Sequence, residues 1–153
     1  MADTYTQIYI QVIFAVHNRM VLIRSKWEVE LYRYITGIVQ NKGQKMLVIN
    51  GTENHLHFLI GMKPNCCLSD LVREVKKSSA EFIKAKKFTN FAFKWQEGFG
   101  AFSYSHSNLP NVIRYIENQK EHHKNKTFKE EYEEFLKIFE VEYKKEHIFD
   151  FFE

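Results

Sequence analysis

The amino-acid sequence predicts an α+β fold of the ferredoxin-like, split βαβ type, in which an antiparallel sheet carries helices on one face and further helices follow. Three observations predict it. Four short segments have the alternation or composition of strands, and four longer ones carry apolar residues at helical spacing. Their order is β-α-β-β-α-β, then two helices. Apolar residues form 44% and aromatic residues 16% of the 153-residue chain, enough for one packed core.

The first strand is predicted over residues 5–16, YTQIYIQVIFAV, where apolar and polar side chains alternate. A polar loop follows, and then apolar residues at helical spacing predict a helix. Ser25 and Glu28 fit a capping box at its start. We expect the helix to end near Gly43, because glycine adopts the left-handed conformation that terminates helices.

The middle of the sheet is predicted to be a hairpin. Residues 46–51, MLVING, and 55–62, HLHFLIGM, have strand composition, and residues 52–54 form the turn between them. An apolar stripe over about residues 68–87 predicts a long helix. Residues 99–106, FGAFSYSH, then complete the sheet as its fourth strand.

Two helices are predicted after the sheet. Ser107 or Asn108 caps the first, with Pro110 in its first turn, where a missing amide has no consequence. Thr127 and Glu130 form a capping box for the second, which is acidic outside. Its inner positions are Phe128, Tyr132, Phe135, Leu136 and Phe139. We expect the aromatic C-terminal tail to dock on the domain or on a partner subunit.

Composition and charge exclude several classes of protein. The net charge is +3, which permits nucleic-acid binding without arguing for it. No apolar stretch is long enough for a transmembrane helix, no signal peptide opens the chain, and no phosphate-cradling GxxxxGK[ST] motif predicts a nucleotide cofactor. Cys66 and Cys67 are adjacent, which disfavours a disulfide, so we expect small buried side chains and a reducing, cytoplasmic setting.

One candidate metal site lies on the second strand of the hairpin. His55 and His57 stand two residues apart, so both imidazoles project from one face of the sheet. Leu56, Phe58 and Ile60 then point to the other face. Two imidazoles on one face can hold one metal ion. A partly exposed strand face explains the same pattern, so the pattern alone does not decide.

A second pair lies on the helix after the fourth strand. Tyr115 and Gln119 stand four residues apart, one turn apart on the same face, beside the apolar stripe. An interfacial tyrosine and a solvated glutamine explain this pair equally well when it is taken alone. His122 extends the same face and is an alternative ligand, whereas His123 falls nearer the apolar stripe.

Together, the two pairs resemble the single-tyrosine HUH transposases of insertion sequences that move as single-stranded DNA. That family has two histidines around a bulky apolar residue, matched here by His55 and His57. It also has a Tyr-x-x-x-Gln motif on a helix near the C-terminal end, matched by Tyr115 and Gln119. The stretch WQEGFGAFSYS before that helix is similar as well.

The resemblance covers roughly residues 5–125. It implies an HUH transposase catalytic domain over residues 1–125, with residues 126–153 forming a C-terminal helix and an aromatic tail of the same domain. It also implies a homodimer that acts on single-stranded DNA with hairpins. We expect the protein in the cytoplasm, in association with the nucleoid. Whether the tyrosine serves its own subunit or its partner is left open.

The resemblance implies a role for each matched residue. His55, His57 and the side-chain oxygen of Gln119 are ligands of a divalent metal, Mg²⁺ or Mn²⁺, and Tyr115 is the nucleophile. A phenol with a pKa of about 10 is a poor nucleophile at neutral pH, and a metal ion neutralises the attacked phosphate. Attack would leave a 5′-phosphotyrosine and a free 3′-hydroxyl. A later 3′-hydroxyl rejoins the strand, so no ATP is needed.

Contacts with DNA are predicted on the long helix over residues 68–87, whose basic face is opposite its apolar stripe. Its cations are Arg73, Lys76, Lys77, Lys84 and Lys87. A solvated helix face explains the same charges. Arg19 and Arg24 are further candidates. Phe102 and Tyr104 either stack on unpaired bases or belong to the core.

Three other interpretations are left open. A domesticated relative would keep the chemistry and act on repeated palindromes. A relaxase or replication-initiator nicking enzyme shares the histidine and tyrosine logic, but the short chain without a second domain disfavours it. A non-catalytic, ferredoxin-like nucleic-acid-binding module would stack bases on aromatic residues of the sheet. That module would leave the four matched residues unconnected.

Overall fold

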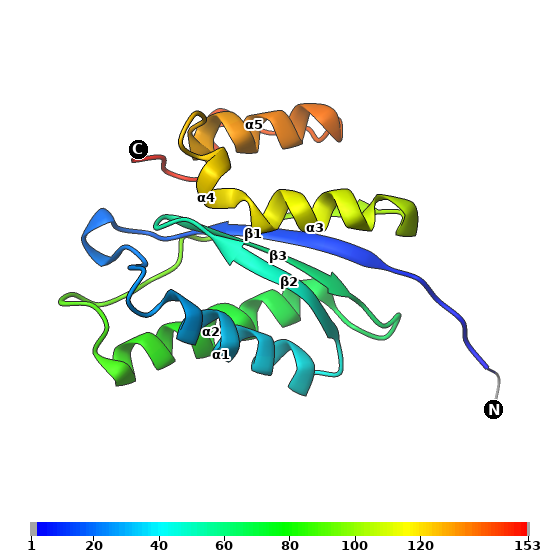
Figure 1. Cartoon of the computed structure of the whole chain (residues 1–153), viewed down its shortest axis with the longest axis horizontal. Helices are drawn as coiled ribbons and strands as arrows, with labels where there is room; N and C mark the ends of the chain where they lie inside the picture. The colour runs from blue at the N-terminus through cyan, green and yellow to red at the C-terminus, as the bar shows by residue number, and fades with distance from the viewer. Residues whose placement is uncertain (1–2, 153) are drawn as a thin grey trace.

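A four-stranded antiparallel sheet, in the order β2-β3-β1-β4, organises the computed structural model, which describes residues 3–152. The strands are β1 (Tyr9–Ala15), β2 (Lys45–Gly51), β3 (His55–Gly61) and β4 (Gly100–Tyr104). The helices are α1 (Glu28–Asn41), α2 (Leu68–Lys86), α3 (Leu109–Glu117), α4 (Gln119–His122) and α5 (Phe128–Ile138). Figure 1 shows α1 and α2 on one side of the sheet and α3, α4 and α5 on the other. The predicted α+β, split βαβ fold is confirmed.

The central strands β1 and β3 determine where the histidines lie. β1 pairs with β3 so that Ala15 stands opposite His55 and Ile13 opposite His57. The turn from β2 into β3 is tight at Gly51, where a Cβ atom would collide with the carbonyl oxygen of His55. Glycine is therefore required there, because it has no Cβ atom. The turn and the register together place the first residue of β3 at the end of the sheet.

Residues of β3 alternate between the two faces of the sheet, as period two requires. Leu56, Phe58 and Ile60 enter the main apolar core, to which α1 and α2 also contribute. His55 and His57 project to the opposite face. Both are 0% exposed, so they are more deeply buried than two histidines on an open strand face. Their projection from a single face is as predicted.

The two predicted capping boxes have different outcomes. α1 begins at Glu28 with Trp27 at the N-cap position and no side-chain capping bond, so the capping box at Ser25 is wrong. The buried Trp27 indole anchors the start of this helix instead. The capping box of α5 is confirmed, since Thr127 accepts from the Glu130 amide and the Glu130 carboxylate accepts from the Thr127 amide.

The predicted tyrosine helix is interrupted in its middle. α3 ends at Glu117, Asn118 leaves the helical conformation, and α4 begins at Gln119. The Asn50 side chain supplies the reason, because its amide donates to the carbonyls of Ile116 and Glu117, each at 3.0 Å. Those carbonyls would accept from the next turn of a continuous helix. A single helix over this whole segment is therefore a wrong prediction.

The start of α3 agrees with the sequence in part. A short 3₁₀ turn (His106–Asn108) precedes it, and Asn108 occupies the N-cap position. Its side chain makes no capping hydrogen bond, so capping by Ser107 or Asn108 is not found. Pro110 lies in the first turn of α3, as expected.

The C-terminal tail packs on its own chain. Phe149 is buried, and its ring centroid lies 5.8 Å from that of Phe128 in α5. The Gln96 side chain accepts from the Asp150 amide at 2.7 Å and donates to the Asp150 carbonyl at 2.8 Å. Of the two expected docking places, the tail therefore uses the domain itself.

Two smaller expectations also meet the structure. Cys66 and Cys67 are both free thiols, but Cys66 is half-buried and Cys67 is exposed, so the expectation of two buried side chains is wrong. Among residues 3–152, no helix combines the length and the apolar character needed to cross a membrane.

Candidate active site

Polar side chains from β3, α3, α4 and α5 meet on one face of the sheet. His55 Nε2 lies 3.1 Å from Gln119 Oε1. The Tyr115 hydroxyl and the Gln119 amide both donate to Oε2 of Glu131, the latter at 2.8 Å. The ring centroids of His57 and Tyr115 are 5.9 Å apart. The four residues singled out from the sequence therefore converge within a single chain, despite the break between α3 and α4.

Glu131 joins these residues, and sequence reasoning missed it. It is 1% exposed. Its Oε1 atom lies 3.0 Å from the Nε2 atoms of His57 and His123, and 3.3 Å from Nε2 of His55. Ligand atoms of His55, His57 and Glu131 all lie within 4.8 Å of one another, so these three residues could hold one metal ion.

The sequence did contain a signal for Glu131. It stands three residues after Phe128 and four before Phe135, within the aromatic stripe that α5 buries. A carboxylate in such a stripe is rarely buried unless it is paired. The Phe128 ring stacks on the His55 imidazole at 3.9 Å between centroids, and Phe135 lies 6.2 Å from His57. The stripe that docks α5 thus carries the carboxylate into the histidine pair.

Neighbouring side chains orient the two imidazoles. His55 Nδ1 lies 2.7 Å from Asn54 Oδ1 and 2.9 Å from Thr52 Oγ1. With its proton on Nδ1, where Asn54 Oδ1 can accept it, His55 would turn the lone pair of Nε2 toward the site, which is how histidine ligands are commonly supported. His57 Nδ1 lies 2.8 Å from the Gln11 amide group. If the Gln11 amide flips, it can either donate to His57 Nδ1 or accept from it, so it is compatible with both tautomers of His57.

In that tautomer of His55, three acceptor atoms meet where a metal ion would fit. His55 Nε2 faces Gln119 Oε1 at 3.1 Å and Glu131 Oε1 at 3.3 Å. Burial lowers the pKa of His55 to about 4, so the ring is neutral at pH 7. A lone pair and two oxygens repel one another at these distances unless a cation lies among them. Imidazole nitrogen and amide or carboxylate oxygen form a donor set suited to a divalent ion.

The electrostatics of the nucleophile candidate depend on the same carboxylate. Burial, followed by the charge and hydrogen bond of Glu131, raises the pKa of Tyr115 above its usual value. Burial alone would raise the pKa of Glu131, but the charge of His57 and the histidine hydrogen bonds hold it well below its usual range. Tyr115 is therefore a protonated phenol that donates to an ionised carboxylate.

The two histidines after Gln119 lie at different distances from the cluster. His122 Nε2 is 4.0 Å from Glu131 Oε2, and its side chain is partly exposed. His123 is closer, with Nε2 3.0 Å from Glu131 Oε1 and a largely buried ring. The sequence placed His122 ahead of His123 as an alternative ligand, whereas in the structure His123 contacts the cluster more closely.

β4 supports the site and presents few free aromatic rings. Phe102 is buried and stacks on Phe135, with 5.1 Å between the ring centroids. The Tyr104 hydroxyl donates to Gln11 Oε1 at 2.8 Å. Gln11 in turn contacts His57, so Tyr104 belongs to the support of the histidines. Of the two roles considered for these aromatic residues, packing inside the protein is the one observed.

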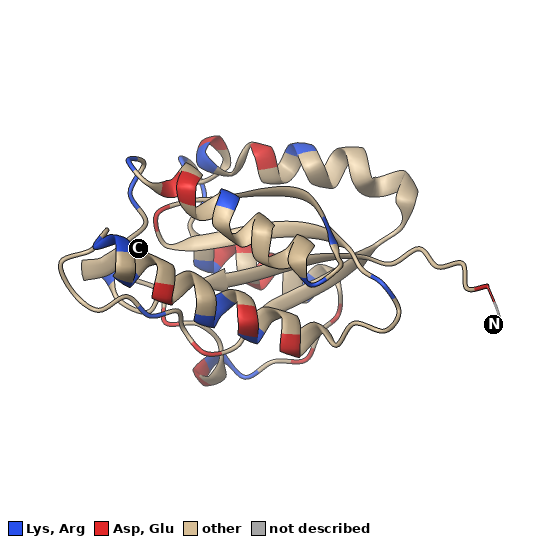
Figure 2. Ribbon diagram, turned by 90° about the horizontal axis from the view of Figure 1, so that it is seen from below, with Lys and Arg blue, Asp and Glu red and all other residues tan. Residues whose placement is uncertain are grey.

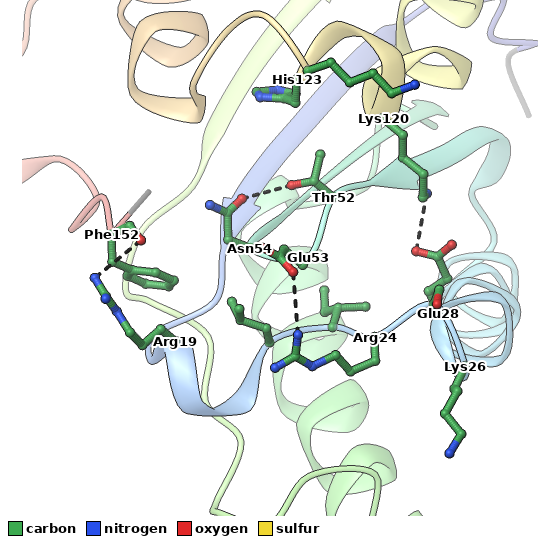
Figure 3. Close-up of a pocket in the computed structure, with 14 residues that line it drawn as sticks. Arg19, Arg24, Lys26, Glu28, Thr52, Glu53, Asn54, Lys120, His123 and Phe152 are labelled. Carbon is green, nitrogen blue, oxygen red and sulfur yellow. Dashed lines mark hydrogen bonds and ion pairs between the residues drawn. The ribbon is translucent and has the colours of Figure 1, made fainter.

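A pocket of about 860 Å³ opens beside the cluster. Figure 3 shows His123 at its rim, together with Thr52 and Asn54, which contact His55. The pocket is lined by five basic side chains: Arg19, Arg24, Lys26, Lys120 and Lys124. Two acidic residues also line it, so the pocket carries an excess of positive charge.

The cations predicted to contact DNA on α2 are on the opposite side of the sheet from the cluster (Figure 1). They are Arg73, Lys76, Lys77 and Lys84. The Lys76 amine donates to the carbonyls of Gln96, at 2.9 Å, and Gly98, and burial lowers its pKa to about 8. Arg73 pairs with Asp70 at 2.8 Å. Seen from the side of α1 and α2, basic and acidic positions are intermingled along the helices (Figure 2). A DNA-binding role for these four residues stays a prediction.

Comparison with known proteins gives a family and a fold. The family model of IS200-like transposases matches residues 4–119. A structure described as a transposase from Deinococcus radiodurans R1 is 18% identical, covers 78% of this chain and 95% of its own, and has a TM-score of 0.61. The structure of a REP-associated tyrosine transposase bound to a REP hairpin is 16% identical. The match covers 80% of this chain and 73% of that structure's chain, with a TM-score of 0.59. At these identities the two structures show a shared fold. No curated protein sequence matches the chain.

Proposed function

We propose, since the chain belongs to the family of IS200-like transposases, that it cuts and rejoins single-stranded DNA through Tyr115 in a metal-dependent reaction. The ligands proposed from the sequence are His55, His57 and Gln119. The observation that supports the proposal is the convergence of these four side chains on one carboxylate, Glu131, within one chain. A module that only binds nucleic acid gives no reason for them to meet.

The proposed covalent step uses the phenol oxygen. The Tyr115 oxygen attacks the phosphorus of a phosphodiester, and the bond from phosphorus to the 3′ oxygen breaks. The phenol proton leaves along its hydrogen bond to Oε2 of Glu131. The 3′ oxygen takes up a proton and departs as a free 3′-hydroxyl, while the 5′-phosphate stays on the tyrosine. Attack by a second 3′-hydroxyl on the phosphotyrosine rejoins the strand. The phosphotyrosine bond retains the energy of the broken phosphodiester, so no nucleotide cofactor is needed.

A bound divalent ion would supply positive charge that neutralises the non-bridging phosphate oxygens. Imidazole and amide groups bind a metal in their uncharged forms, so His55, His57 and Gln119 as ligands would leave that charge available to the phosphate. A mixed set of nitrogen and oxygen donors suits Mg²⁺ or Mn²⁺ and also binds Zn²⁺. Tyr115 has its pKa raised by burial and by Glu131, so it needs such compensation to react at neutral pH.

The proposed substrate is single-stranded DNA that folds into hairpins. The REP-associated structural neighbour is bound to a REP hairpin, which makes repeated palindromes a candidate substrate class. The basic pocket beside His123 offers charge for a strand next to the cluster. A homodimer stays a prediction; each single chain already brings Tyr115 beside its own His57.

The proposal is tested by trapping the covalent intermediate. The protein is incubated with a single-stranded DNA hairpin and Mn²⁺, and denaturing gels and peptide mapping follow. We expect an adduct on Tyr115 that is lost in Tyr115→Phe and kept in Tyr34→Phe. Tyr34 is a matched control because it lies on α1, on the other side of the sheet. An adduct that survives Tyr115→Phe would overturn the assignment.

A further inference from the structure

We infer that Glu131 is itself a ligand of the metal, so that the C-terminal helix α5 supplies a carboxylate to the site. The inference rests on the proposed function, because it concerns the ion assigned to His55, His57 and Gln119. It adds a charged ligand from a segment that lies beyond residues 4–119, the part that the family model matches.

The spacing of the donor atoms supports a shared ion. Glu131 Oε1 lies 3.0 Å from His57 Nε2 and 3.3 Å from His55 Nε2. Ligand atoms bound at about 2.1 Å to one ion are roughly 3.0–3.4 Å apart, in octahedral or tetrahedral geometry. Gln119 Oε1, at 3.1 Å from His55 Nε2, has the same spacing. The carboxylate oxygen therefore occupies a ligand position as fully as the amide oxygen does.

Burial and charge support the same assignment. Glu131 is 1% exposed, and a buried carboxylate is costly unless a positive charge compensates it. Its immediate surroundings include the imidazoles of His55, His57 and His123. A divalent ion bound among these groups would place positive charge directly beside the carboxylate.

The two oxygens of Glu131 have separate partners. Oε2 accepts from the Gln119 amide and the Tyr115 hydroxyl, whereas Oε1 faces the Nε2 atoms of His55 and His57. One oxygen can therefore bind the ion while the other positions the third ligand and the phenol. A carboxylate also favours hard ions such as Mn²⁺ and Mg²⁺ more than imidazoles alone would. Metal binding should then tie α5 to β3.

The first test is the affinity for Mn²⁺ alone, measured by calorimetry on the full chain without DNA. We expect Glu131→Gln to weaken binding at least about tenfold. Glu134→Gln is the matched control, because it removes the same charge from the exposed side of the same helix, and it should bind as the unaltered chain does. His57→Ala should abolish binding.

The outcomes separate the two proposals. If the unaltered chain fails to bind Mn²⁺, the proposed metal dependence fails. If Glu131→Gln binds as tightly as the unaltered chain while His57→Ala does not bind, the metal site stands and the role of Glu131 is overturned.

A second measurement does not depend on any variant folding. Amide hydrogen exchange of the unaltered chain is compared with and without Mn²⁺. If Glu131 is a ligand, amides of α5 should exchange more slowly with the ion, because a metal bond joins this helix to β3. If Glu131 is not a ligand, the ion binds the Nε2 atoms of His55 and His57, which then no longer contact the carboxylate of Glu131. Exchange on α5 would then be unchanged or faster, which would contradict the inference.

Discussion

The two faces of strand β3 bury their side chains equally and for different purposes. Toward α1 and α2, Leu56, Phe58 and Ile60 are 0% exposed, and toward α3, α4 and α5, so are His55 and His57. On the apolar face, removing apolar surface from water is enough to stabilise the packing, and apolar side chains of similar volume can replace one another there. On the polar face each nitrogen requires a particular atom opposite it. Equal burial therefore reflects apolar packing on the face toward α1 and α2 and a specific set of polar contacts on the face toward α3, α4 and α5.

The partners on the polar face also come from more distant parts of the chain. Gln11 contacts His57 from β1, and Gln119 and Glu131 reach the histidines from α4 and α5. The polar face is thus assembled only when the C-terminal helices dock. Substitutions on the two faces should therefore differ in kind: loss of chemistry on one, loss of stability on the other.

The largest effect is expected from deletion of a single oxygen on the polar face. Tyr115→Phe should reduce the rate of adduct formation by at least about a thousandfold, because the nucleophile is gone. On the apolar face, Phe58→Leu should change that rate by no more than a few-fold. Adduct formation and urea unfolding are measured on the same preparations. A similar loss of rate in Tyr115→Phe and Phe58→Leu would contradict the claim that only the polar face of β3 carries the chemistry.

A large effect on stability is expected from the apolar face. Phe58→Ala should lower the free energy of unfolding by about 3–5 kcal/mol, because it removes buried area and leaves a cavity. Val29→Ala, at an exposed position on α1, should change it by less than about 0.5 kcal/mol. Urea unfolding measures both. Equal effects would mean that Phe58 is not part of a packed core.

A smaller effect is expected from pH, and it arises on the polar face. Burial lowers the pKa of His55 from 6.5 to about 4. Between pH 6.5 and pH 4, His55 is therefore protonated in the unfolded chain and unprotonated in the folded chain. Stability of the metal-free protein should therefore fall as the pH falls, by about 1.5 kcal/mol from pH 6.5 to 5. Denaturant unfolding with a chelator measures the slope, which His55→Gln should reduce. Stability that is constant or rises over this range would contradict a buried neutral His55.

The smallest effect concerns DNA and compares one arginine from each side of the sheet. Arg24 lines the pocket and Arg73 lies on α2; both are exposed and both pair with a carboxylate, at 3.6 Å and 2.8 Å. If DNA binds beside the cluster, Arg24→Ala should weaken single-strand binding a few-fold and reduce the salt slope by about 0.7. Arg73→Ala should then have no effect. The reverse result would support the DNA contacts predicted on α2 and move the strand to that side.

The success of the sequence at the site has a physical basis in local periodicity. Residues two apart on a strand share a face, which is why His55 and His57 could be paired from the sequence. Tyr115 and Gln119 still converge although the helix between them breaks at Asn118. The break depends on Asn50, a residue far away in the sequence, and no local pattern contains it.

Sequence alone determined the order of the four strands and of the two helices between them, the face on which the histidines lie, and the family. Periodicity and short motifs encode these features within a few residues of one another. Only the tertiary structure decided what packs over the histidines: Glu131, the close approach of His123 and the basic pocket all depend on how α4 and α5 dock. The physical reason is that a helix stripe records which side will be buried but not against what. A carboxylate among aromatic residues acquires its partners only when that stripe meets the sheet.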